Sequence, residues 1–123
     1  MKTNTFKKSF LLLAVSFFAA SLTTFAQEAK TITGEVLDMA CYSANGASGE
    51  GHKSCATACI KGGSPMGILT SDGKVYLLVE NHDKKDAYAE AKKYAGEQVT
   101  ATGTLSEKGG LQTLIVNELK PKG

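Results

Sequence analysis

Residues 97–105, EQVTATGTL, alternate between apolar or small side chains and polar ones, most of them threonine. The apolar or small residues at every second position are Val99, Ala101, Gly103 and Leu105. This period of two predicts a strand with one buried face and one exposed face. The turn sequence EKGG follows at 107–110, and a second apolar run, LQTLIVNEL, occupies 111–119. The two runs predict a β-hairpin, so the chain has to build a sheet around it.

Three earlier segments also predict strands, because they are rich in β-branched and apolar residues. They are 31–38, 67–70 and 74–80. In the last of these, Tyr76 alternates with Val75 and Leu77, so we expect its ring on the outer face, where it could contact a ligand.

Two segments predict helices, at 55–61 with Ser54 as its cap and at 84–95 with Asp83 as its cap. The second helix carries an apolar stripe formed by Ala87, Tyr88, Ala91, Tyr94 and Ala95. Residues 43–51 are rich in glycine, serine and asparagine without apolar periodicity, which is typical of a loop.

The order of these elements predicts a mainly β fold with one or two helices, one of them between strands 3 and 4. The order, the GEV of 34–36 and the V-x-A-x-G-x-L of 99–105 together resemble the OB-fold. The resemblance implies a five-stranded Greek-key barrel. It says little about the ligand, since one fold serves many functions. A small β-sandwich or an α+β meander remains the alternative.

Residues 1–26 are typical of a secretory signal peptide. Three lysines precede the apolar run FLLLAVSFFAASL, and small residues lead to Ala26. The run is shorter than the roughly 20 residues that a membrane-spanning helix needs. We therefore expect cleavage after Ala26, which leaves 27–123 as a single domain without a membrane anchor. Its expected location is the periplasm or the medium outside the cell.

The remaining chain is weakly acidic. Three of the 14 basic residues lie in 1–26, which leaves 11 lysines against 12 acidic residues, and there is no arginine. All five phenylalanines also lie in 1–26. Nucleic-acid binding is therefore not expected, because it needs a basic groove and stacking aromatic rings. No motif with a catalytic triad, paired carboxylates or a phosphate-binding loop is present, so no catalytic residue is predicted.

The connection between the first two strands, 39–66, is enlarged and contains all three cysteines and one of the two histidines. The order is C-x10-H-x2-C-x3-C, formed by Cys41, His52, Cys55 and Cys59. Three thiolates and an imidazole form a complete tetrahedral ligand set for Zn²⁺. Thiolates suit Cu(I) equally, with Met39 and Met66 as further thioether candidates. We therefore predict a non-catalytic metal-binding module.

Two other interpretations of the cysteines remain. A disulfide from Cys41 to Cys55 or Cys59 would staple the loop of an OB-type domain that binds a small molecule, a glycan or an envelope protein, and would leave one free thiol. A thiol oxidoreductase would instead use Cys55 at a helix N-terminus, with His52 as its base and only Asp38 or Glu50 to orient that base. His82 is expected to be solvated or to cap the helix that follows.

The cysteine–histidine run continues into G-x-P-x-G at 63–67. The combined pattern resembles that of small exported bacterial proteins. This resemblance implies an exported, compact domain and indicates no particular chemistry.

Overall fold

The computed structural model describes residues 27–123, so the predicted signal peptide lies outside the described residues. Five strands, three α-helices and two 3-10 turns follow one another. In chain order they are β1 (Lys30–Asp38), α1 (Met39–Asn45), η1 (Glu50–His52), α2 (Lys53–Lys61), β2 (Met66–Thr70), β3 (Val75–Glu80), α3 (Lys85–Ala91), η2 (Lys92–Tyr94), β4 (Gln98–Lys108) and β5 (Leu111–Pro121). The prediction of a mainly β chain with five strands is confirmed.

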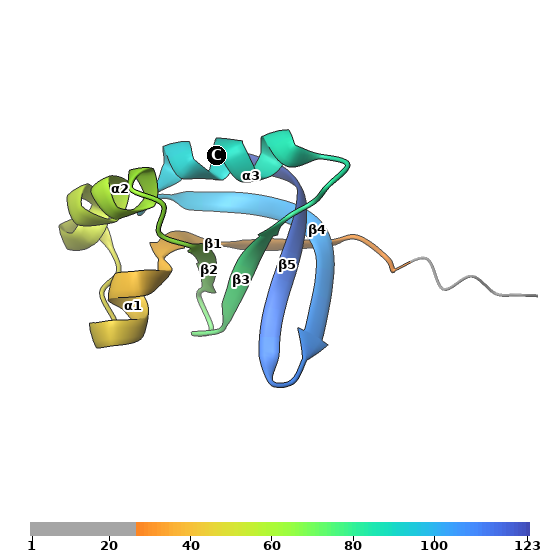
Figure 1. The fold of residues 1–123 in the computed structure, drawn as a ribbon, viewed down its shortest axis with the longest axis horizontal. Coiled ribbons are helices and arrows are strands. Elements are labelled where there is room, and N and C mark those ends of the chain that lie inside the picture. Colours follow the sequence, from red (N-terminus) through yellow and green to blue (C-terminus); the bar gives the residue numbers. More distant parts are fainter. Residues whose placement is uncertain (1–26) are drawn as a thin grey trace, which may run out of the picture.

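The strands pair in a closed ring with the order β1-β2-β3-β5-β4, and β4 returns to β1. Four of the pairings are antiparallel, and the pairing of β3 with β5 is parallel. Helices α1 and α2 lie together at one side of the strands, and α3 lies across them (Figure 1). The ring therefore carries two separate helical connections, one between β1 and β2 and one between β3 and β4.

The core fills the inside of the ring with small and branched apolar side chains. On β4 the predicted alternation is confirmed, because Val99 and Ala101 are fully buried and Leu105 packs against the core. The threonines point outward, where Thr31 and Thr102 share a hydrogen bond of 2.9 Å between their hydroxyl groups. Gly103 is required by close packing, since a Cβ atom there would collide with the backbone carbonyl oxygen of Ile115.

The expected outward position of Tyr76 is wrong. Its ring is half-buried and packs against the hydrophobic core, on the same side as the buried Leu78. The two residues share one face because side chains alternate along a strand, so positions two apart point to the same side. Tyr76 is therefore a packing residue.

The helix over 84–95 is present as α3 followed by the 3-10 turn η2, and its apolar stripe faces the core as predicted. Its predicted cap at Asp83 is wrong. Residue Lys84 precedes the helix without a side-chain cap, and Asn81 accepts the backbone N–H of Asp83 at 2.9 Å instead. The predicted cap at Ser54 is also wrong, because η1 runs directly into α2 and the helix already begins at Lys53.

The number of helices was underestimated, since α1 occupies part of the segment expected to be a loop. No residue of α1 is buried, so its sequence carries no apolar periodicity that could reveal it. Its ends are defined by polar contacts. Asp38 caps its first turn, and Gly46, in the left-handed conformation with φ of 72°, donates its N–H to the carbonyl of Tyr42.

Candidate metal centre

Cys41 is positioned by the abrupt change from strand to helix at Asp38. The carboxylate of Asp38 accepts the backbone N–H of Ala40 at 3.0 Å and that of Cys41 at 3.4 Å. These N–H groups belong to the first helical turn, and N–H groups there have no carbonyl partner within the helix. Asp38 therefore starts α1 directly after β1 and places Cys41 in its first turn.

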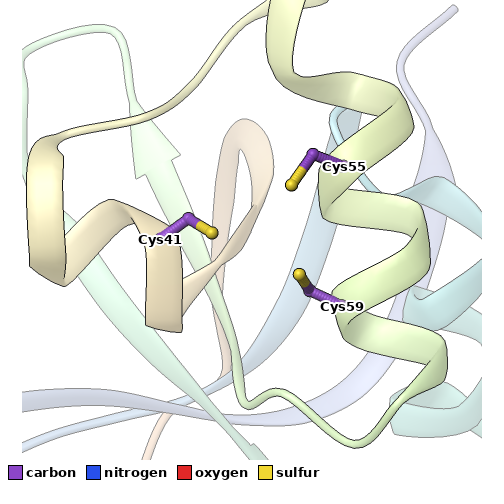
Figure 2. A group of neighbouring side chains, drawn as sticks. All are labelled: Cys41, Cys55 and Cys59. Carbon is purple, nitrogen blue, oxygen red and sulfur yellow. The ribbon is translucent and has the colours of Figure 1, made fainter.

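Cys55 and Cys59 are oriented by the packing of two neighbouring residues of α2 against the core. Ala56 and Ile60 of this helix are 2% and 1% exposed and belong to the hydrophobic core. Residues four apart lie on one face of a helix, so Cys55 and Cys59 share a face one turn apart. Burial of the neighbouring pair rotates that face toward α1, as Figure 2 shows.

The three sulfur atoms converge between the two helices. The sulfur atoms of Cys41, Cys55 and Cys59 all lie within 4.8 Å of one another. Figure 2 shows the Cys41 side chain reaching from α1 toward the two cysteines of α2. All three thiols are free, with Cys55 exposed and the other two half-buried. The predicted meeting of distant cysteines is therefore present, and none of them forms a disulfide.

His52 lies beside this group, on the side of Cys41. Ligand atoms of Asp38, Cys41 and His52 form a second set within 4.8 Å of one another, and no such set among the described residues joins His52 to Cys55 or Cys59. The Nε2 atom of His52 is 3.9 Å from Asp38 Oδ2. It is buried without a hydrogen-bond partner in this structure. A buried nitrogen without a partner is costly, so it is available to a ligand.

The loop before His52 is held by a buried carboxylate. Glu35 on β1 is 9% exposed, and its Oε1 accepts the backbone N–H of Gly49 at 2.7 Å. Gly49 has a φ of 81°, which favours glycine, and it directly precedes η1. This contact ties the end of the loop to the ring, so the position of His52 depends on β1 as well as on α2.

Sequence reasoning missed the central role of Asp38, which it treated only as an acid available to orient His52. Asp38 is 1% exposed and also accepts a hydrogen bond from the Ser64 hydroxyl. Burial alone raises the pKa of its carboxyl, but the hydrogen bonds from Ser64, Cys41 and Ala40 outweigh this and lower the pKa to about 2. The available signal was an aspartate at the last position of a strand, since aspartate is a preferred helix cap.

Two of the three thiols, those of Cys41 and Cys59, are held in their protonated form when no ion is present. The hydrogen bond of the Cys41 thiol to Asp38, together with burial and the negative charge of Asp38, raises the pKa of Cys41 to about 12. Burial and the neighbouring Cys55 raise the pKa of Cys59 as well. A metal ion that binds sulfur must therefore displace these protons.

The two methionines offered as thioether ligands serve packing. Met66 is fully buried and belongs to the hydrophobic core. Met39 lies against β2, where its sulfur would be 2.5 Å from a Cβ atom added to Gly67. His82 is exposed in the turn before α3, as expected. Tyr42 is half-buried on α1 and follows Cys41 in the sequence.

Comparisons of the chain with protein-family models, with curated proteins and with solved structures found no match. The geometry of this site is therefore the observation that indicates a function.

Proposed function

We propose that this protein is a metal-binding module in which Cys41, Cys55 and Cys59 hold one ion. The observation that supports it is the convergence of three free thiols within 4.8 Å from two helices that are separate in the sequence. Soft thiolate ligands select Zn²⁺ or Cu(I). The ion would join α1, which buries no side chain of its own, to α2, which is packed on the core.

His52 is the fourth ligand in this proposal when the ion is Zn²⁺. Zinc at a structural site takes four ligands in a tetrahedron, whereas three sulfur atoms alone can satisfy Cu(I). The buried Nε2 atom without a partner supports this role, and it is already close to Cys41. A small movement of the imidazole toward α2 would complete the tetrahedron.

The test is metal analysis combined with a thiol count on natively purified protein. We expect about one ion per chain, and almost none after replacement of any of the three cysteines by serine. His52→Ala should lower zinc affinity by at least about 10–100-fold, the range typical of the loss of a group that only supports a ligand, while Cu(I) is retained. His82→Ala is the matched control and should change neither. Protein with no ion and a quantitative disulfide would refute the proposal.

A second candidate function follows from the same proximity. Oxidation would link Cys41 to Cys55 or Cys59 after a small movement, and the resulting disulfide would staple the connection of a domain that binds a small molecule, a glycan or an envelope protein. Intact mass before and after alkylation separates the two candidates, because this one leaves one alkylated thiol. A third possibility is thiol oxidoreductase chemistry at Cys55, and slow alkylation of that thiol at neutral pH would remove it.

We also propose that the protein is exported, with residues 1–26 removed and 27–123 folding as one domain. The basic and apolar pattern of the leader supports this. In the part of the chain that the structure describes, no helix has the length and apolar character needed to cross a membrane. Mass spectrometry of the purified protein should find Gln27 at the N-terminus. An intact Met1 in the purified protein would contradict export through this leader.

We infer that the closed ring is a barrel of the OB type. Its support is the element order, with α3 between β3 and β4, and the parallel pairing of β3 with β5 that completes the ring. Ligands of OB-folds contact the loops beside the first strands, where the cysteine connection of this chain also lies. An experimental structure with a different strand order would overturn this assignment.

A further inference from the structure

Asp38 connects the two helices that carry the cysteines through a continuous series of hydrogen bonds. On one side its carboxylate accepts the backbone N–H of Cys41 at 3.4 Å. On the other side it accepts the hydroxyl of Ser64, a residue that follows α2. The backbone N–H of Ser64 then donates to the carbonyl of Cys59 at 3.0 Å. The series of hydrogen bonds from Cys41 to Cys59 therefore passes through the side chains of Asp38 and Ser64.

The carboxylate of Asp38 has little capacity left to bind an ion itself. Its Oδ1 accepts two donors, the Ala40 N–H and the Ser64 hydroxyl, and its Oδ2 accepts the Cys41 N–H. Among the described residues, the other titratable groups that interact with it are the thiols of Cys41 and Cys59 and His52 Nε2, the last at 3.9 Å from Asp38 Oδ2. Its side chain is completely buried, so water does not screen its negative charge.

We propose that Asp38 is the positioning residue of the metal site and that its buried charge favours a divalent ion over a monovalent one. This inference rests on the proposed function of the cysteine cluster. The attraction between a fixed charge and an ion scales with the charge of the ion. A carboxylate beside Cys41 therefore stabilises bound Zn²⁺ twice as strongly as Cu⁺ at the same position. Asp38 accordingly shifts the selectivity of the site toward Zn²⁺ relative to Cu⁺.

The experiment compares Zn²⁺ with Cu⁺, two ions that share a filled d shell and differ in charge. Affinities are measured anaerobically by competition with a chelator of each ion, for the full exported protein and three variants. Asp38→Asn keeps an oxygen for Ala40 and Ser64 but removes the charge. Ser64→Ala keeps the charge but removes the link to α2. Asp83→Asn removes an exposed carboxylate in the turn before α3 and is the matched control.

We expect Asp38→Asn to lower the ratio of zinc affinity to copper affinity by about 3–10-fold. Loss of a group that supports a metal ligand typically lowers affinity by about 10–100-fold, and the expected change in the ratio is half of that range on a logarithmic scale. The ratio is the informative quantity, because binding of either ion removes the same proton from Cys41. The free-energy cost of removing that proton therefore cancels in the ratio. Ser64→Ala should lower both affinities by a similar factor, with the ratio unchanged. A purely structural role of Asp38 would also leave the ratio unchanged.

An unchanged ratio in Asp38→Asn would overturn the preference for divalent ions. Unchanged affinities in Ser64→Ala would overturn the positioning role. If Asp38→Asn does not yield folded protein, Asp38→Ser carries the same test, because serine caps a helix about as well as aspartate and has no charge. Wild-type protein that binds neither ion would overturn the proposed function itself. Zinc binding with unaltered ratios would overturn this inference alone.

Discussion

The two helical connections of the ring are held in place by different forces. Residues 81–97 contain α3, which packs against β3 and β5 and buries Ala87 and Ala91 in the core. Residues 39–65 contain α1 and α2, and only α2 buries side chains. The first of these connections, 81–97, is therefore fixed mainly by apolar packing, and hydrogen bonds from Asn81 to Asn117 and from Gly96 to Val36 tie its ends to the ring. The second is fixed partly by Asp38, Glu35 and Ser64, through hydrogen bonds.

This difference indicates that the connection 39–65 is the one suited to a functional site. Helix α3 is attached to the core by its alanines. Helix α1 depends on polar contacts instead, and its cysteine points toward the two cysteines of α2 (Figure 2). An ion between α1 and α2 would supply the attachment that α1 does not obtain from the core. The comparison therefore predicts that ion-dependent effects appear in 39–65 and are absent from 81–97.

The largest expected effect is the pH dependence of zinc affinity. The pKa of Cys41 is raised to about 12 and that of Cys59 is raised as well, so both thiols are protonated near neutral pH and lose their protons to bind the ion. Each released proton makes affinity rise about tenfold per pH unit, so the protons of Cys41 and Cys59 alone give a rise of at least about 100-fold. Chelator competition at pH 6, 7 and 8 measures the slope. A slope of tenfold or less per unit would contradict this count.

Core packing of α2 gives the next largest effect. Ile60 is 1% exposed, and its truncation in Ile60→Ala should lower the free energy of unfolding by about 2–5 kcal/mol. Urea unfolding in the presence of a chelator measures this on ion-free protein. Ala58→Gly, at an exposed position of the same helix, is the control and should cost about 1 kcal/mol. Equal losses would mean that α2 is not attached to the core in this way.

Asp38 and Asp83 provide a direct comparison between the two connections. Asp38→Ala removes a helix cap and should lower the free energy of unfolding by about 1–2 kcal/mol. Asp83→Ala should have no measurable effect, because its side chain does not cap α3. Thermal unfolding of ion-free protein measures both. Similar losses in the two variants would show that the two aspartates stabilise their connections equally.

The contribution of Asp38 to stability depends on pH in a defined direction. The folded pKa of Asp38 is lowered to about 2, below the value near 3.9 of an unfolded aspartate. Its contribution to stability is therefore complete above about pH 4 and is lost as the pH falls toward 2. Asp38→Ala should show a flatter loss of stability over this interval.

The smallest expected effect is a local change in dynamics. Zinc binding should slow amide hydrogen exchange in α1 by about tenfold or more, because the ion attaches a helix that has no buried side chain. Exchange in α3 should stay the same. Mass spectrometry of peptic fragments from ion-free and zinc-loaded protein provides the measurement. Equal protection in both helices would indicate a general stabilisation instead.

Much of the ring was predictable because its signals are local. The alternation at Val99, Ala101 and Leu105 predicted which face of β4 is buried, and the alanine stripe predicted the face of α3. Helix α1 was not predictable from periodicity, since a helix without a buried face has none. The Asp83 and Ser54 caps failed because neighbouring residues, Asn81 and the preceding 3-10 turn, determine where each helix begins.

The sequence by itself determined the residue types of the site: thiols and an imidazole at a spacing that favours a metal or a disulfide. Only the tertiary structure decided that Cys41 meets Cys55 and Cys59, and that His52 lies nearer to Cys41 than to the other two. It also brought Asp38 and Ser64 together, although they are 26 residues apart. The reason is physical: local patterns report which side of an element is buried, whereas contacts across a long connection depend on how separate elements pack.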